Sequence, residues 1–152
     1  MPLNHESQNE RLTDAQFAAI GKLVVEWSNI EFLLRLLLTR LLLTPAFPGW
    51  TFIDRLDVSR VQDAIEEAIP LHAHRYQHGI LSEQVLDEIS ELNKRIVNLR
   101  TTRNKFAHFC WSRTTDDEIF WVNLTARLPG KKPDKRFVAL TLVEINSFYT
   151  ER

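Results

Sequence analysis

The sequence predicts a mainly α-helical fold: an antiparallel, up-and-down bundle of helices with a small β-hairpin inserted before the C-terminal helix. Two long segments, 13–43 and 82–107, repeat apolar residues at intervals of three and four positions, which is typical of helices that bury one face. Between residues 109 and 124, apolar and polar residues alternate on either side of a polar turn, which is the pattern of a hairpin. A bundle that carries a small sheet accommodates both patterns.

The first predicted helix begins at Thr13, where Thr13-x-x-Gln16 forms a capping box, and ends at Leu43 before a proline. Its apolar stripe consists of Ile20, Val24, Trp27, Glu31, Leu34, Leu38 and Leu41. A carboxylate, that of Glu31, therefore lies within the stripe. The opposite side begins polar but continues as Leu33 and Leu36, so the second half of the helix is apolar nearly all round and has to be covered on two sides.

The next two segments are predicted as a loop and a second helix. Residues 44–58 hold two prolines and a glycine among aromatic residues, which favours a packed loop that covers helix ends. The second helix is predicted from Ser59, with Ser59-x-x-Gln62 as its cap, to Pro70 or a little after it. Residues 71–79 are predicted to be irregular.

Three histidines in this irregular segment, His72, His74 and His78, raise the question of a metal site. His74 and His78 would share one face if the segment were helical. No acidic or cysteine residue lies nearby at ligand spacing, so we expect a solvated loop and no metal.

The third predicted helix is capped by Ser82 and runs to about Ala107. Its apolar stripe consists of Val85, Ile89, Leu92, Ile96, Leu99, Arg103 and Phe106. Arg103 lies at the centre of this stripe, where a leucine or isoleucine would serve stability better. We predict that Arg103 pairs with Glu31, which holds the equivalent place on the first helix. Such a pair adds little net stability, because desolvation offsets most of the Coulomb gain.

After His108 the pattern becomes that of a hairpin, with a turn at residues 114–117. A loop at 129–133 precedes a possible short strand, Arg136 to Leu140. Thr141-x-x-Glu144 then forms a capping box for a final helix that is predicted to reach the C-terminus.

Length and composition point to one globular domain over residues 1–152, with a polar, flexible lead-in at 1–12. Hydrophobic residues make up 44% of the chain, charged residues make up 26%, and the formal charge is −1. A near-neutral chain argues against a general nucleic-acid coat protein. The single cysteine, Cys110, excludes an internal disulfide, and the chain has neither a signal peptide nor an uninterrupted apolar span. We therefore expect a cytoplasmic protein that does not enter membranes.

Whether the side chains of Arg103 and His108 can approach each other depends on where the third helix ends. His108 lies about 140° around the helix axis from Arg103 if the helix simply continues. The two side chains converge only if the helix ends near Ala107 and the backbone turns the imidazole back. Asn104 lies four positions before His108 and could orient it while the helix lasts.

The segment Arg103-Asn104-Lys105-Phe106-Ala107-His108 resembles the R-x(4–6)-H signature of HEPN domains, including the asparagine that frequently follows the arginine. A preceding apolar helix that contains Trp27-Ser28-Asn29-Ile30-Glu31, and an aromatic residue, Trp111, shortly after Ala-His, are similar to the same family. The resemblance covers roughly the first 110 residues and leaves the hairpin and the C-terminal tail outside it.

This resemblance implies a helical bundle that forms a homodimer, places two Arg/His sets in one cleft and, in many members, cleaves RNA without a metal or another cofactor. Arg103 and His108 would be catalytic, and Asn104 and Glu31 would support them. The chemistry suits these residue types, because histidine can act as base or acid near neutral pH. The planar fork of arginine matches phosphate oxygens.

Further residues are weaker candidates for binding RNA. The basic cluster of Lys131, Lys132, Lys135 and Arg136 could hold phosphates, although a solvated loop is the plainer interpretation. Trp111 could stack on a base, although aromatic residues in a hairpin usually pack on the bundle. Cys110 has aromatic neighbours on both sides and is expected to be a buried thiol.

Three functions stay open on this basis. The first is a dimeric endoribonuclease of the HEPN type, with the character of a toxin that a partner protein holds in check. The second is a non-catalytic module that binds a nucleotide or another protein through the same residues. The third is a structural helical adaptor with an apolar groove and no affinity for phosphate.

Overall fold

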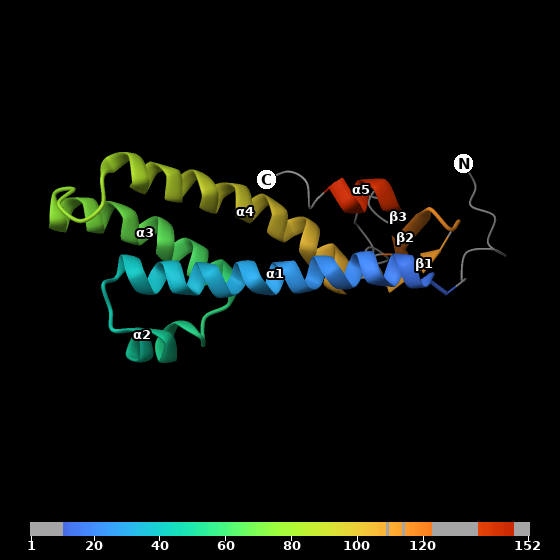
Figure 1. The fold of residues 1–152 in the computed structure, drawn as a ribbon, viewed down its shortest axis with the longest axis horizontal. Helices are drawn as coiled ribbons and strands as arrows, with labels where there is room; N and C mark the ends of the chain where they lie inside the picture. Colours follow the sequence, from blue (N-terminus) through green and yellow to red (C-terminus); the bar gives the residue numbers. More distant parts are fainter. Residues whose placement is uncertain (1–10, 109, 114, 123–136, 148–152) are drawn as a thin grey trace, which may run out of the picture. The chain divides into compact units, whose positions relative to one another are not determined.

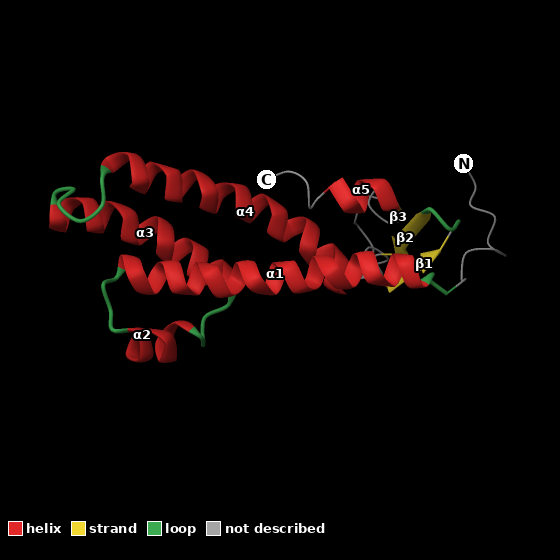
Figure 2. Ribbon diagram, in the orientation of Figure 1, coloured by secondary structure: helices red, strands yellow, loops and turns green. Residues whose placement is uncertain are grey.

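The computed structural model describes residues 11–108, 110–113, 115–122 and 137–147 (Figure 1). Their order along the chain is α1 (Asp14–Leu41), α2 (Ala46–Ile53), α3 (Val58–Tyr76), α4 (Glu83–His108), β1 (Cys110–Arg113), β2 (Glu118–Val122), β3 (Phe137–Thr141) and α5 (Leu142–Ser147). The predicted fold class is confirmed: the chain is mainly helical, and a small antiparallel sheet precedes the last helix (Figure 2).

The chain divides into two compact units. One, here called the helical unit, is Glu26–Thr102. The other, here called the sheet unit, combines Met1–Val25 with Arg103–Arg152. Helices α1 and α4 each continue from one unit into the other. The division therefore does not test the predicted single domain over 1–152, which stays a prediction.

The core of the helical unit is built from α1, α2, α3 and α4. Its buried members are Trp27, Leu34, Leu38, Leu41, Ile53, Val61, Ile65, Ala68, Leu86 and Ile96. The members from α1 are separated by seven, four and three residues and belong to the predicted stripe, which is therefore confirmed for this part of the helix. Further towards the start of α1, Leu23 is buried in place of the predicted Val24. The helix stops at Leu41 rather than Leu43, because Leu43 has a left-handed backbone with a φ of 51°.

The predicted loop at 44–58 is wrong in its middle, where α2 forms. Pro45 is the N-cap and Pro48 lies in the first turn of α2. N–H groups in the first turn have no acceptor within the helix, so a proline there costs no helical hydrogen bond. Gly49 lies against Thr39, so close that a Cβ atom would meet the threonine methyl at 2.8 Å. The ring of Trp50 packs on that of Phe32 from α1, with centroids 5.2 Å apart. Residues typical of loops thus form a short helix that covers part of α1.

The second predicted helix begins earlier and ends later than its sequence pattern indicated. Asp57, not Ser59, is the N-cap of α3, and its carboxylate accepts a hydrogen bond from the Arg60 N–H at 3.0 Å. The helix continues through Pro70 to Tyr76, so the predicted irregular segment is helical as far as residue 76. A proline inside a helix costs about 3 kcal/mol. Packing of Ile69 and Ala73 against the core of the helical unit helps to offset this cost.

The face of α4 that packs in the helical unit differs from the predicted stripe. The cap is confirmed, because the Ser82 hydroxyl accepts from the Val85 N–H at 3.3 Å. Buried positions are Leu86, Asn93 and Ile96, whereas three stripe members are exposed, namely Val85, Leu92 and Leu99. At Leu86 and Asn93 the buried face is displaced by one residue from the predicted stripe, because polar side chains on α4 bind α3.

These polar contacts join α3 and α4 inside the core. The Asn93 side-chain amide donates to the Gln62 carbonyl at 3.0 Å and to a Glu66 carboxylate oxygen at 2.9 Å. Ser90 donates to the other Glu66 oxygen at 2.9 Å, and Arg100 donates to the Gln62 side-chain oxygen at 2.7 Å. Buried polar networks of this kind fix the register of two helices more than they add stability.

In the sheet unit the strands are ordered β1-β2-β3, and both pairings are antiparallel. The predicted hairpin is confirmed, with Trp111 opposite Trp121 and Arg113 opposite Ile119. The possible strand at Arg136 to Leu140 is confirmed as β3, shifted by one residue. The core of the sheet unit consists of Leu23, Phe106, Ile119 and Ile145, with Leu12, Ala19, Ile20, Trp111, Leu140 and Leu142 packed against it.

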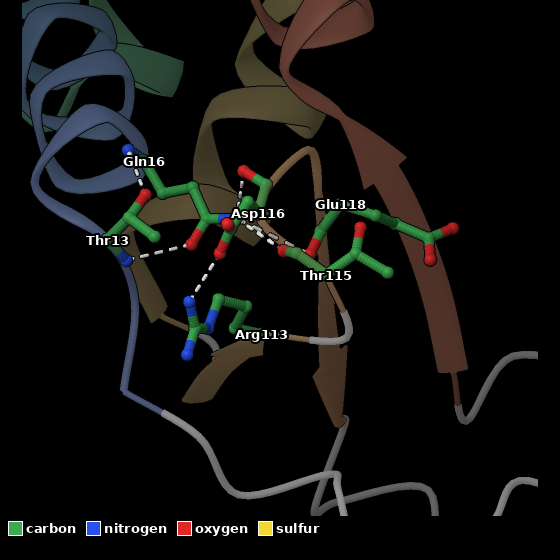
Figure 3. Close-up of polar contacts among 6 residues, drawn as sticks. All are labelled: Thr13, Gln16, Arg113, Thr115, Asp116 and Glu118. Atoms are coloured by element: carbon green, nitrogen blue, oxygen red, sulfur yellow. Dashed lines mark hydrogen bonds and ion pairs between the residues drawn. The ribbon is translucent and has the colours of Figure 1, made fainter.

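Gln16 attaches the start of α1 to the hairpin (Figure 3). The predicted capping box is confirmed, because the Thr13 N–H donates to the Gln16 side chain at 2.9 Å and the Gln16 N–H donates to the Thr13 hydroxyl at 3.2 Å. The same side chain, which is completely buried, donates to the carbonyls of Thr115 and Asp116 at 3.0 and 3.1 Å. Across the turn, Arg113 donates to the Asp116 carboxylate. One glutamine therefore caps a helix and binds a turn that lies far along the chain.

The predicted capping box of the last helix is also confirmed. The N–H of Thr141 donates to the Glu144 carboxylate at 2.7 Å, its hydroxyl donates to the same oxygen at 2.9 Å, and the Glu144 N–H donates back at 3.2 Å. The helix that this box starts, α5, is described from Leu142 to Ser147. The predicted extension to the C-terminus and the loop at 129–133 lie outside the described residues.

This capping box makes α5 sensitive to acid. The backbone N–H of Thr141, and then its hydroxyl, hold the pKa of Glu144 below its usual value of 4.5. The contact therefore stabilises α5 fully above pH 4.5 and is lost as the pH falls through the lower, folded pKa. Replacing Thr141 by valine is expected to raise the pKa of Glu144 towards 4.5, as measured by an NMR titration of its carboxyl carbon. An unchanged pKa would contradict the assignment.

Among the residues that the structure describes, none of the helices combines the length and apolar character needed to cross a membrane.

Candidate functional site

The candidate site is the C-terminal end of α4, where the sequence predicted Arg103 and His108 to meet. Arg103 is half-buried, and its guanidinium donates a hydrogen bond to the Asn104 side-chain oxygen at 3.1 Å. Asn104 itself is exposed. The asparagine that was predicted to orient His108 is therefore engaged with the arginine, and it holds one edge of a planar, phosphate-matching group.

His108 is the last residue of α4, so the helix ends one residue later than predicted. Its backbone is still helical, which places it about 140° around the axis from Arg103. The His108 side chain lies outside the described part of the structure, and the predicted contact with Asn104 does too. Within one chain, positions 103 and 108 therefore lie on different sides of the helix axis.

Trp111 determines how the chain leaves α4. Its ring nitrogen donates to the Phe106 carbonyl at 3.0 Å, and its ring stacks on that of Phe106 with centroids 4.8 Å apart. The Phe106 carbonyl is among the last four of the helix, which have no partner within it. Trp111 thus caps the helix from β1, and one face of its ring is covered. This geometry favours the core-packing interpretation of Trp111 over base stacking.

The segment from Arg100 to His108 carries Arg100, Arg103 and Lys105 and no acidic residue. Basic side chains near a helix C-terminus are favoured by the helix dipole, which is the ordinary structural reason for such a cluster. Arg100 already donates to the Gln62 side-chain oxygen on α3.

Glu31, the predicted partner of Arg103, is half-buried on α1 in the helical unit. Its carboxylate accepts a hydrogen bond from the Trp27 ring nitrogen and lies 3.9 Å from the Arg35 guanidinium. The predicted pair with Arg103 would join the helical unit to the sheet unit, and it stays a prediction. The contacts with Trp27 and Arg35 already explain why the apolar stripe of α1 tolerates a carboxylate.

Several other predicted residues lie outside the described part of the chain. The basic cluster Lys131, Lys132, Lys135 and Arg136 falls wholly within residues 123–136. The Cys110 side chain, Phe109 and the first turn residue, 114, are also outside it. Within the described residues, no three or more His, Cys, Asp or Glu side chains gather as a metal site would require.

The histidines after Pro70 are placed differently from the prediction. His72 and His74 lie on α3 rather than in a loop, and His72 is buried. Gln77 and His78 have positive φ angles and end the helix. The burial of His72 could not be predicted from its local pattern, because the residues on either side of it do not repeat at helical spacing in the way that the predicted stripes do.

No family model, curated protein or solved structure matches this chain. The resemblance to HEPN domains therefore depends on the residues themselves: the Arg103 to His108 spacing, the asparagine after the arginine, and the place of both at the end of a long helix.

Proposed function

We propose that the protein is a metal-independent endoribonuclease of the HEPN type that acts as a homodimer, with Arg103 and His108 as its catalytic residues. The observation that carries this proposal is that both residues lie in the last two turns of α4, directly before β1. Asn104 holds the guanidinium of Arg103, and the capping contact of Trp111 fixes the point at which the helix ends. These contacts hold the Arg103 guanidinium and the end of α4 in place.

The proposed reaction needs two proton transfers and one charged transition state. One His108 removes the proton of the RNA 2′-hydroxyl, and the 2′-oxygen attacks the adjacent phosphorus. Arg103 stabilises the negative charge of the phosphorane through its fork of N–H groups. The bond from phosphorus to the 5′-oxygen then breaks, and an imidazolium donates a proton to that oxygen. The products are a 2′,3′-cyclic phosphate and a 5′-hydroxyl end.

A dimer supplies what one chain lacks in this scheme. Arg103 and His108 of one chain leave α4 about 140° apart, so a second copy is the simplest source of an imidazole that faces Arg103. In the helical unit, α1 exposes Phe32 and Leu33, which would favour an interface between copies. The exposed leucine is one of the two that the sequence singled out for this purpose.

The test is to incubate the purified protein with RNA in EDTA between about pH 6 and 8, the range over which histidine titrates. We expect cleavage that leaves 2′,3′-cyclic phosphate ends, and a loss of at least about 100-fold in His108→Ala and in Arg103→Ala, typical of removing one acid–base or charge-stabilising group. Circular dichroism checks that each variant is folded.

Matched controls come from the same protein. Arg95→Ala removes an exposed cation from α4, and His78→Ala removes an exposed histidine, so both are expected to cleave at the wild-type rate. Equal cleavage by His108→Ala and the wild type would contradict the proposal, as would the absence of any cleavage. If expression inhibits growth and Arg103→Ala relieves the inhibition, the enzyme acts as a toxin and calls for a neutralising partner protein.

A second function is favoured by one observation, the separation of positions 103 and 108 by about 140° around the axis of α4. Without a convergent pair, Arg103 with Asn104 could hold the phosphate of a nucleotide and cleave nothing. This non-catalytic module predicts intact RNA together with a rise in melting temperature on addition of nucleotide, and the loss of that rise in Arg103→Ala.

A further inference from the structure

His72 is a buried histidine whose ring nitrogens have no hydrogen-bond partner among the described residues. It lies on α3 in the helical unit and is only 3% exposed, yet neither Nδ1 nor Nε2 is bonded to another protein group. A neutral imidazole offers one donor and one acceptor, and leaving such a buried group unsatisfied costs about 1–3 kcal/mol. A group of this kind is evidence of a missing partner rather than of good packing.

The imidazole borders two cavities of the helical unit. The larger has a volume of about 600 Å³ and is formed mainly by the ends of α1 and α3. The smaller, of about 280 Å³, lies towards the start of α4 and is lined by Leu37, Ile80, Leu81 and Ile89 among others. His72 and Leu41 line both. The larger volume falls within the range of about 300–1,000 Å³ that is typical of small-molecule sites.

The smaller cavity is lined mainly by leucine and isoleucine, whereas the larger one is also lined by His74, Arg75 and Tyr76. None of the lining residues carries a carboxylate, and the arginines, Arg40 and Arg75, are exposed. Beside His72, an ion would lose its hydration against apolar side chains such as Leu41, so a neutral ligand is favoured there.

An aromatic ring lies beside the buried imidazole of His72. The Tyr76 ring lies 4.9 Å from the His72 ring and is inclined to it by 55°, and both residues line the larger cavity. Aromatic ligands prefer such tilted surroundings to a flat stack. A hydroxyl on an aromatic ligand would supply the hydrogen-bond partner that His72 lacks.

From these features we propose that this cavity binds a small, uncharged aromatic molecule that carries one hydroxyl group, a ligand of the phenol class, with His72 as its hydrogen-bond partner. The phenol hydroxyl donates to the unprotonated imidazole nitrogen, and the ring contacts Leu41 and Tyr76. The site lies within the helical unit and does not depend on the proposed ribonuclease activity.

The experiment measures binding of phenol, benzene and benzoate to the full chain by calorimetry and by thermal melting. We expect phenol to bind about tenfold more tightly than benzene, which is the effect of one hydrogen bond of about 1.4 kcal/mol. Benzoate is expected not to bind, because burying a carboxylate beside apolar side chains costs more than burying a hydroxyl. Equal affinities for phenol and benzene, tighter binding of benzoate, or no binding of phenol would each overturn the proposal.

Two variants locate the binding. His72→Leu keeps an apolar side chain and removes both ring nitrogens, so its affinities for phenol and benzene should be equal. His78→Asn, at an exposed position with a left-handed backbone that asparagine accepts, should bind as the wild type does. If His72→Leu fails to fold, NMR of the wild-type imidazole decides: phenol must shift the His72 ring signals, and unshifted signals would overturn the proposal.

Discussion

Replacing Gln16 by alanine is expected to lower the free energy of unfolding by about 3 kcal/mol, in steps of about 1 kcal/mol for each hydrogen bond lost. The substitution removes the capping-box partner of the Thr13 N–H and both donors to the carbonyls of Thr115 and Asp116. Because Gln16 is completely buried, water cannot easily replace these partners. Urea unfolding of the wild type and the variant measures the difference.

Two further variants separate the roles of Gln16. Thr13→Ala removes only the hydroxyl that accepts from the Gln16 N–H, and should cost about 1 kcal/mol. Gln16→Glu keeps an acceptor for Thr13 but places a carboxylate against two carbonyls, so at neutral pH it should be at least as harmful as alanine. If Gln16→Glu were as stable as the wild type, the contacts with the hairpin turn would contribute nothing.

Replacing Asn93 by aspartate is expected to be similarly severe, at about 3 kcal/mol or more, because it leaves a buried charge without a partner. The Asn93 amide donates to the Gln62 carbonyl and to the Glu66 carboxylate, whereas an ionised aspartate can only accept. A second carboxylate would also face that of Glu66 at hydrogen-bond distance. The measurement is again urea unfolding at neutral pH.

Asn93→Leu is the matched control for this position. Leucine removes the donors without adding charge, and Glu66 keeps its hydrogen bond from Ser90, so the expected cost is smaller, about 1–2 kcal/mol. Equal destabilisation by aspartate and leucine would mean that the network between α3 and α4 carries no electrostatic selectivity.

Features governed by residues close together in the sequence were predicted well. The capping boxes at Thr13 and Thr141 and the cap at Ser82 depend on atoms three residues apart and were predicted correctly, whereas the same pattern at Ser59 was wrong because Asp57 caps α3. The hairpin follows from alternation in the same way. The helix α2 was missed because Pro48 is compatible with a first turn as well as with a loop, and only contacts such as that between Trp50 and Phe32 select the helix.

Features that depend on another segment were predicted less well. Helix α3 passes Pro70, where Ile69 and Ala73 pack against the core of the helical unit, and a local pattern cannot reveal such packing. The turned face of α4 follows from the hydrogen bonds of Asn93, a residue that a hydrophobicity pattern counts as solvent-facing.

The candidate site shows the same difference between local features and features that depend on another segment. The position of Arg103 within α4 and the end of the helix near His108 were predicted from the sequence to within one residue. The partner of Asn104 and the capping of the Phe106 carbonyl by Trp111 were not predicted, because side-chain direction depends on contacts across the helix end. Neither His72 nor its cavity has a sequence signature.

The contacts of Gln16 also have a consequence for the order in which the protein is assembled. They join residues 99 and 100 positions apart in the sequence, and bringing the ends of such a loop together costs roughly 4 kcal/mol of chain entropy. During synthesis on a ribosome, the N-terminal turn of α1 is made early, and its partner hairpin is made only after about two thirds of the chain has followed. All residues of the helical unit, which are contiguous in the sequence, are synthesised during this interval. Long-range closure of this kind slows folding, so the sheet unit is expected to fold last.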